Sequence, residues 1–263
     1  MLDIAAEIRL RKSKPPRIQL EIGAAVSLED GMGESVKVKA SDGHELSAYV
    51  ARPEGEPIGA LVVIQEIFGV NQSIREVADA YAKDGLLAIA PALFDRFEHD
   101  LELGYGEQDL KKAFAIYPKL DPNVSLRDVA AAFKYAAGSG KGVGVLGFCY
   151  GGLVSWLAAT RGNDQAFEPA CTVCYYPGGI GKVAAEEPAC PVLIHFGGAD
   201  EHIGKDQVDA VRKAHGEHED EVTIYVYEGA GHAFANAQRP SYKAEPAKLA
   251  RERSLEFLKA NIA

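Results

Sequence analysis

The sequence is poor in cysteine and in long hydrophobic runs. Four cysteines in 263 residues are too few for a disulfide framework, which favours a reducing compartment. No apolar run approaches the roughly 18 residues of a membrane-spanning helix. The N-terminal stretch "MLDIAAEIRLRKSKPP" also lacks the apolar core of a signal peptide. We therefore expect a cytoplasmic protein with no membrane partner.

Positive charge is scarce as well, with 28 basic against 38 acidic residues and a net charge of −10. Nucleic acids and anionic membrane surfaces are bound through basic patches, so no nucleic-acid partner is predicted. The hydrophobic share of 47% and the charged share of 25% are those of an ordinary globular protein.

The domain organisation follows from the absence of repeats, low-complexity tracts and long Gly/Ser/Pro linkers. We expect a single domain over residues 34–263, because α/β folds often reach about 250 residues as one unit. Residues 1–33 are expected to be an N-terminal extension, with a short amphipathic helix over 2–11 that Pro15 and Pro16 stop. Packing or a dimer contact is the role considered for it, and the patterns leave monomer and homodimer open.

The chain then alternates between strand and helix patterns. An exposed hairpin is predicted over 34–40 and 44–53, joined by the turn "SDG". Six apolar runs follow and read as parallel strands buried on both faces: 59–65, 86–91, 142–147, 170–176, 190–196 and 222–227. Helices are predicted between and after them: 72–84, 108–117, 124–137, 151–161, 205–216 and 245–261. The prediction is an α/β fold with a mostly parallel eight-stranded sheet, an antiparallel N-terminal hairpin and helices on both faces.

The pair of cysteines in "CTVC" suggests half of a redox or metal site. However, Cys171 and Cys174 lie in a β-branched and aromatic segment, and no second pair stands at zinc-ligand spacing. Both are therefore interpreted as buried strand residues. The sequence predicts neither a metal nor a cofactor.

A third cysteine stands in "VLGFCYGG", directly after an apolar run and before a predicted helix. The pattern G-x-C-x-G is that of a nucleophile elbow, with the sulfur of Cys149 in place of a serine oxygen. Gly147 and Gly151 would leave room for the sharp turn, and the helix N-terminus would favour a thiolate. Taken alone, the segment is equally compatible with a small buried residue in a glycine-rich turn.

A thiol nucleophile needs a base and an acid that orients the base. His232 is the leading base, because "EGAGHAF" directly follows a predicted strand. His202 also follows a strand closely and remains a minor rival, whereas His195 is expected to be packed inside one. The other histidines are expected to be solvated: His44, His99, His215 and His218.

The orienting acid is predicted to be Asp200, which lies just past the strand "CPVLIHF". Its neighbour Glu201 is the alternative, although its side chain would point elsewhere on the loop. The resulting chain order, Cys149, Asp200, His232, is the order of the α/β-hydrolases. Three such residues, each after its own strand, make the nucleophile interpretation much stronger than the elbow alone.

The loop "IQEIFGVN" follows the first predicted parallel strand, where α/β-hydrolases supply one N–H of the oxyanion hole. We assign that hole to the backbone amides of Ile67 and Tyr150. Glu66 is unusual there, because burying a carboxylate is costly unless something uses it. It is expected either to contact the Cys149 thiol and control its ionisation or to form a salt bridge with Arg75.

Four segments together resemble the dienelactone hydrolase (carboxymethylenebutenolidase) family of α/β-hydrolases: "QEIFGVN", "GFCYGG", "GGADEHI" and "YEGAGHAF". The resemblance extends over about residues 35–260. It implies Cys149 as nucleophile, His232 as base and then acid, Asp200 as its orienting carboxylate, and Glu66 as the group that helps deprotonate the thiol. It also implies opening of a lactone ring to a dicarboxylic acid, without a cofactor.

The sequence departs from that family where the substrate carboxylate would be bound. Members that act on dienelactone carry an arginine shortly after the catalytic histidine, and this chain has Asn236 there, with Arg239 three residues further on. Arg96 and Lys111 are other possible substitutes, although surface charge explains each of these basic residues equally simply. Arg239, Arg96 and Asn236 are the substrate-binding candidates.

The sequence thus predicts a cysteine hydrolase of small lactones or activated esters. A carboxylesterase of different substrate range is one alternative, and a non-catalytic ligand-binding or redox-sensing relative is another. The complete triad argues against a sensor, which needs only the reactive cysteine. A serine esterase is disfavoured because the chain contains no G-x-S-x-G.

Overall fold

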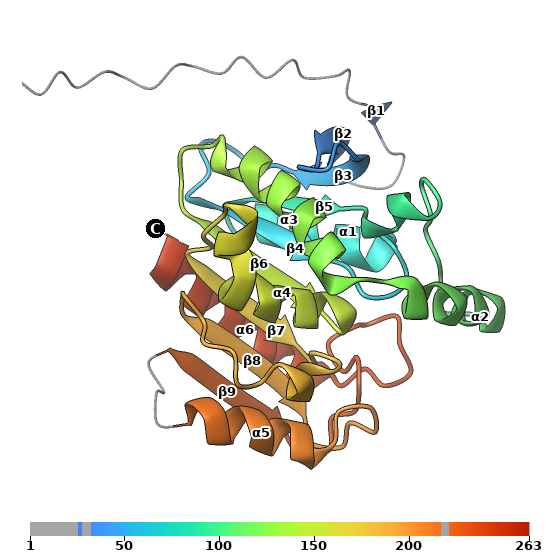
Figure 1. Ribbon diagram of the computed structural model, residues 1–263, viewed down its shortest axis with the longest axis vertical. Helices are drawn as coiled ribbons and strands as arrows, with labels where there is room; N and C mark the ends of the chain where they lie inside the picture. The colour runs from blue at the N-terminus through green and yellow to red at the C-terminus, as the bar shows by residue number, and fades with distance from the viewer. Residues whose placement is uncertain (1–25, 28–32, 217–220, 263) are drawn as a thin grey trace, which may run out of the picture.

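The computed structural model describes residues 26–27, 33–216 and 221–262. In these ranges the chain forms one nine-stranded sheet in the order β1-β2-β3-β5-β4-β6-β7-β8-β9 (Figure 1). The strands are β1 (Val26–Ser27), β2 (Glu34–Lys39), β3 (Glu45–Ala51), β4 (Gly59–Ile64), β5 (Leu86–Pro91), β6 (Val143–Phe148), β7 (Cys171–Tyr175), β8 (Val192–Gly197) and β9 (Val222–Tyr227). Strands β2 to β9 coincide with the eight predicted ones, which confirms the fold class.

The additional strand, β1, lies inside the segment predicted to be an extension. It pairs antiparallel with β2 through Val26 and Ser27. The sheet therefore begins before residue 34, earlier than the sequence pattern indicated. The short helix predicted over 2–11 lies outside the described residues.

All six predicted helices are present: α1 (Gln72–Lys83), α2 (Glu107–Ile116), α3 (Pro122–Ala137), α4 (Tyr150–Arg161), α5 (Lys205–His215) and α6 (Ala244–Ile262). Helices α1 and α6 cover one face of the sheet and α3, α4 and α5 the other (Figure 1). Helix α2 projects from the body beyond the sheet and is followed by the 3₁₀ turn η2 (Tyr117–Lys119). Three more 3₁₀ turns are η1 (Leu93–Arg96), η3 (Gly162–Gln165) and η4 (Ile180–Lys182).

Burial of the strands follows their place in the sheet. Every residue of β4 to β8 is buried, as predicted for parallel strands covered on both faces. The prediction was wrong for β9, whose four central residues are only half-buried. Strand β9 is paired in the sheet through β8 and ends the strand order, so it has less cover than the central strands.

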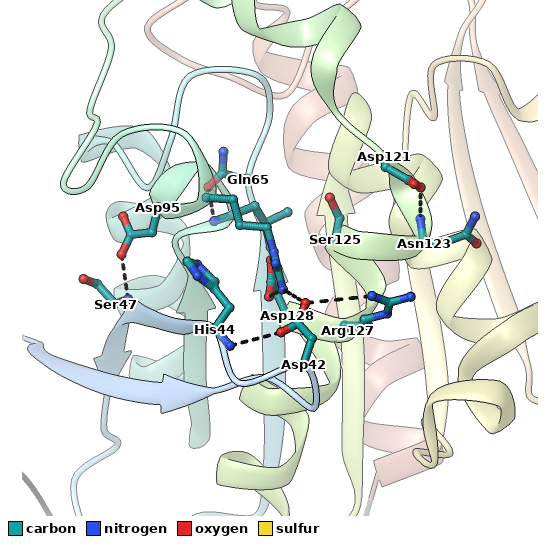
Figure 2. Close-up of polar contacts among 12 residues, drawn as sticks. Asp42, His44, Ser47, Gln65, Asp95, Asp121, Asn123, Ser125, Arg127 and Asp128 are labelled. Atoms are coloured by element: carbon teal, nitrogen blue, oxygen red, sulfur yellow. Dashed lines mark hydrogen bonds and ion pairs between the residues drawn. The ribbon is translucent and has the colours of Figure 1, made fainter.

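Polar contacts tie the N-terminal hairpin to the body (Figure 2). The backbone N–H of Ser47 in β3 donates to Asp95 at 2.8 Å. Asp42 in the hairpin turn accepts from Arg96 at 2.9 Å. Arg96 also donates two hydrogen bonds of 2.7 Å to Asp128 on α3. The Arg96 guanidinium thus holds the hairpin turn and α3 together.

The topology places the carboxyl ends of the central strands at one edge. From β4 the chain crosses to β5 on one side, and β6 lies on the other side of β4. Ligands of open α/β sheets bind at such a switch in strand order. Residues that follow β4 and β6 therefore meet where a site is expected.

Candidate active site

Cys149 lies at the apex of a sharp turn between β6 and α4. Its φ of 54° and ψ of −113° are unfavourable for a residue with a side chain. A Cβ on Gly147 would lie 2.1 Å from the Gly151 oxygen, and one on Gly151 would lie 2.4 Å from the Gln65 oxygen. The glycines of the motif are therefore required by backbone contacts, and the strained turn presents Cys149 at the end of the strand.

His232 and Asp200 follow β9 and β8, as predicted. His232 Nδ1 lies 2.8 Å from Asp200 Oδ2. The other carboxylate oxygen of Asp200 accepts the backbone N–H groups of His202 at 2.8 Å and Ile203 at 3.0 Å. The hydrogen bonds fix the carboxylate, which in turn fixes the imidazole.

The electrostatics of this group favour a charged imidazole. Burial disfavours the charged form of His232, but hydrogen bonds and negative charge from Asp200 and Cys149 outweigh it and raise its pKa to about 10. Although burial also opposes ionisation of Asp200, its hydrogen bonds with His232 and the two amides lower the pKa of that carboxyl. The surroundings of His232 thus favour the imidazolium form at neutral pH.

Glu66 directly follows β4 and is only 3% exposed. Its carboxylate accepts a hydrogen bond from Asn236 Nδ2 at 2.9 Å and a long one from the Tyr105 hydroxyl at 3.5 Å. Burial raises the pKa of Glu66 despite the charge of Arg239 and these hydrogen bonds. Arg75 pairs with Glu102 instead, so the salt bridge considered for Glu66 is not formed.

Cys149, His232 and Glu66 meet in a cavity of about 290 Å³. The residues around it combine charged and apolar side chains: Glu66, Ile67, Phe68, Leu110, Phe114, Tyr117, Cys149, Gly178, Gly179, His202, His232, Ala233 and Arg239. Ile67, one predicted oxyanion-hole residue, is among them. Tyr150, the other, is the first residue of α4, where helical N–H groups lack intrahelical acceptors.

The three substrate-binding candidates have different surroundings. Arg239 lines the cavity, with its guanidinium carbon 5.3 Å from the Phe68 ring centre and 5.2 Å from that of Tyr105. Asn236 is instead engaged with Glu66 and with the Tyr105 hydroxyl, at 2.8 Å from the latter. Arg96 lies outside the lining and is held by acidic partners, so we withdraw it as a candidate.

The remaining histidines show where sequence patterns succeeded and failed. His195 is packed inside β8 as predicted, with its ring nitrogens 2.9 Å from the Tyr227 and Ser254 hydroxyls. His202, the rival base, lines the cavity and contacts the His232 ring edge-on at 5.0 Å. His215 was predicted to be solvated but is buried, because Trp156 packs on it and the Ala184 carbonyl lies 2.7 Å from its Nε2.

Three histidines are left. His99 is exposed as predicted, whereas His44, also predicted to be solvated, is half-buried in the hairpin turn. His218 lies outside the described residues. Cys171 and Cys174 are buried in β7, as interpreted from the sequence. Within the described ranges, no group of three or more His, Cys, Asp and Glu side chains could hold a metal ion. In the same ranges no helix is long and apolar enough to cross a membrane.

Sequence reasoning missed two tyrosines of the site. Tyr105 reaches Glu66 from the loop before α2, and Tyr176 packs its ring on His232 with 5.1 Å between ring centres. Tyr176 follows β7 directly, so the search of strand ends that identified the other residues could also have identified Tyr176. The loop around Tyr105 carries no comparable signal.

The fold, together with a cysteine, an aspartate and a histidine that follow separate strands in this chain order, is that of an α/β-hydrolase. A family model described as "Dienelactone hydrolase family" matches residues 46–262. The chain therefore belongs to the dienelactone hydrolase family, and it is a hydrolase that acts on esters or lactones.

Individual relatives agree with this assignment. A carboxymethylenebutenolidase of Pseudomonas putida is 32% identical over 233 residues, covering 86% of this chain and 95% of that protein. A Methylorubrum extorquens protein is 36% identical over 233 residues, covering 81% and 76%. A crystal structure from Klebsiella pneumoniae matches with a TM-score of 0.72 at 29% identity, covering 89% of this chain and 98% of that one.

Proposed function

We propose that the protein is a cysteine hydrolase of small lactones or activated esters, with Cys149 as nucleophile, His232 as base and acid, and Asp200 as the group that orients the imidazole. The observation that carries the proposal is the convergence of Cys149 and His232 at one cavity, with Cys149 on a strained turn and His232 held 2.8 Å from Asp200.

In the first step the Cys149 thiolate attacks the substrate carbonyl carbon, and the carbonyl electron pair moves to the oxygen. The backbone N–H groups of Ile67 and Tyr150 stabilise the resulting oxyanion. When the tetrahedral intermediate collapses, the C–O bond of the ester breaks and the His232 imidazolium gives its proton to the leaving alkoxide. A thioester on Cys149 remains; for a lactone, the freed hydroxyl stays on the acyl chain.

In the second step water hydrolyses the thioester. Neutral His232 removes a proton from the water molecule, whose oxygen attacks the acyl carbon. Collapse expels the Cys149 thiolate, releases the carboxylic acid and restores the thiolate–imidazolium pair. The negative charge of Asp200 stabilises the imidazolium in both steps.

Glu66 is the proposed assistant for activation of the thiol. It lines the same cavity as Cys149, and burial raises its pKa, which makes the carboxylate a stronger base. Its hydrogen bonds in this structure come from Asn236 and Tyr105. Before the first step Glu66 would take the proton of the Cys149 thiol and hold it on a carboxyl whose neutral form burial favours, which leaves the thiolate that attacks the substrate.

The mechanism is tested with Cys149→Ala in a panel of lactones and activated esters. We expect kcat/KM to fall by about 10⁴-fold or more. Cys190→Ala is the matched control, because burial raises the pKa of Cys190 to about 12 and this residue lies outside the cavity lining. Iodoacetamide should inactivate the wild type and the control alike. Full hydrolysis by Cys149→Ala would eliminate the nucleophile, and tight ligand binding without turnover would favour the redox-sensing alternative.

For the substrate class, we propose that Arg239 receives an anionic group of the substrate. It lines the cavity with Cys149, and its Nε has no hydrogen-bond partner among the residues that the structure describes. Arg239→Ala should lower kcat/KM for carboxylated lactones about 10-fold or more relative to neutral esters. Arg239→Lys is the control that keeps the charge but not the planar fork. Equal losses on both substrate types would make Arg239 a packing residue and favour a carboxylesterase of other range.

A further inference from the structure

Tyr176 holds an unusual backbone conformation beside the catalytic group. It follows β7 with a φ of 35°, a value that costs energy for a bulky residue. Its N–H donates to the His195 carbonyl at 2.8 Å, and its ring packs on His232 and Phe234, with 5.1 and 5.6 Å between ring centres. A strained tyrosine against the imidazole suggests that its position serves the site.

The phenol of Tyr176 is fully buried, yet no hydrogen-bond partner for its hydroxyl exists in the part of the chain that the structure describes. Buried hydroxyl groups in native proteins almost always have a protein or water partner. Burial, together with the nearby charges of Glu66 and Cys149, holds the pKa of Tyr176 well above its ordinary value. The hydroxyl is therefore a donor close to the Glu66 charge.

A small cavity adjoins both groups. Tyr176, Glu66 and Asn236 line it, and it leaves about 10 Å³ for the centre of a water molecule. Roughly that volume is needed to hold one water molecule. Ser73 and Val77 line both this small cavity and a cleft of about 320 Å³ on the side of α1 and α6. Glu66 is the residue that lines both the small cavity and the cavity around Cys149.

We propose that one water molecule in this small cavity accepts a hydrogen bond from the Tyr176 hydroxyl and donates one to the Glu66 carboxylate. Tyr176 is then a positioning residue that stabilises the ionised form of Glu66 through the water. The functional part of the inference rests on the proposed role of Glu66 in activating Cys149.

Several titratable groups face Glu66, and each of them raises or lowers its pKa. The charges of Arg239 and His232 favour its ionised form, as do the hydrogen bond of Tyr105 and, by our inference, that of Tyr176 through water. Loss of the Tyr176 hydroxyl therefore removes one of the contributions that lower the pKa of Glu66 against the effect of burial. The pKa of Glu66 should rise in Tyr176→Phe.

The experiment compares wild type, Tyr176→Phe, Glu66→Gln and the double variant, all as the full-length protein. At a pH where Glu66 is ionised, Tyr176→Phe should lower the unfolding temperature in the wild-type background and change it much less in the Glu66→Gln background. In addition, the acidic limb of the pH profile of kcat/KM should move to higher pH by about one unit in Tyr176→Phe. Tyr81→Phe is the matched control, since Tyr81 is also a fully buried tyrosine but does not line the small cavity.

A phenol that is merely unpaired predicts the opposite sign, because its removal would raise the unfolding temperature equally in both backgrounds. That result, or an acid limb that does not move, overturns the proposal. Failure of the proposed function gives a different outcome. In that case Glu66→Gln retains full kcat/KM, whereas the coupling between positions 66 and 176 in the unfolding temperature persists.

Discussion

Two buried carboxylates of this protein, Asp128 and Glu66, have opposite kinds of partner. Asp128 on α3 has a fully buried side chain and accepts two hydrogen bonds of 2.7 Å from the Arg96 guanidinium. Glu66 is buried almost as completely, but its hydrogen bonds come from the neutral groups of Asn236 and Tyr105. Burial raises the pKa of both carboxyls, but at Asp128 the hydrogen bonds and the charge of Arg96 oppose that rise, whereas the groups that donate to Glu66 carry no charge.

The two carboxylates therefore suit different roles, one structural and one chemical. A buried charge with a bidentate partner has a strong preference for one ionisation state, which suits a structural link. A buried carboxylate with neutral partners has a raised pKa and is easily protonated, which suits a group that exchanges protons with substrate or thiol. The position of each follows, since Asp128 joins the hairpin network and Glu66 lines the cavity.

The largest effect should come from breaking the pair of Arg96 and Asp128. Arg96→Ala leaves Asp128 buried without its cation, so we expect the free energy of unfolding to fall by about 3–5 kcal/mol. Denaturant unfolding at neutral pH measures this loss. The kcat/KM of the folded fraction should be unchanged, because Arg96 lies outside the cavity lining.

Arg96→Lys is the control for this pair, and it should lose less stability because it keeps the charge but not the bidentate geometry. A loss below about 1 kcal/mol in Arg96→Ala would mean that the pair behaves like an exposed salt bridge. The comparison with Glu66 would then fail.

Glu66→Gln should show the reverse pattern, with activity lost and stability kept. We expect kcat/KM to fall about 10²-fold to 10⁴-fold, the range of a general acid–base group. Steady-state kinetics on activated esters measures the fall, and Glu102→Gln is the control because Glu102 pairs with Arg75 outside the cavity lining. Unchanged kinetics in Glu66→Gln would remove Glu66 from the mechanism.

The pH dependence of stability sharpens the same comparison. Because the pKa of Glu66 is raised on folding, its contribution is fully present below the unfolded value near 4.5 and is lost as pH rises through the folded value. The stability of Glu66→Gln relative to wild type should therefore increase as pH rises above about 4.5. Thermal unfolding across pH 4 to 8 measures the trend, and a constant difference would show that burial does not perturb Glu66.

The smallest effect is expected at Asn236, which donates to Glu66 at 2.9 Å. Asn236→Ala should cost about 1–3 kcal/mol of stability where Glu66 is ionised, because it removes a hydrogen bond to a charged group. The acid limb of kcat/KM should also shift to higher pH, since the ionised form loses a donor. Asn123→Ala on α3 is a surface control that should leave the acid limb where it is.

Strand ends were the part of the site that the sequence could predict. Cys149, Asp200 and His232 each follow a strand, and a parallel sheet brings such ends to one edge by its construction. Glu66 was found by the same rule. The alternation of apolar runs and helical patterns was sufficient to predict eight strands and six helices. A buried strand is a continuous apolar run, which the local sequence shows without knowledge of the neighbouring strands.

The partners of these residues were not predictable, because they come from distant loops. Asn236 contacts Glu66 across 170 positions of the sequence, and Tyr105 across 39. The same limit explains the burial of His215, whose charged neighbours predicted exposure whereas Trp156 and Ala184 enclose it. Side-chain burial depends on packing that a local pattern does not encode.

The turn at Cys149 places different constraints on its flanking residues and on its apex. Backbone atoms crowd Gly147, Gly151 and Gly152, with a Cβ on Gly152 falling 2.6 Å from the Tyr175 oxygen. The apex residue, by contrast, is held by its own N–H and carbonyl, which bond to Tyr175 and Gly178. The flanking positions therefore require glycine. The backbone bonds of the apex do not depend on its side chain, so another small residue such as serine can replace Cys149 without a change in the turn.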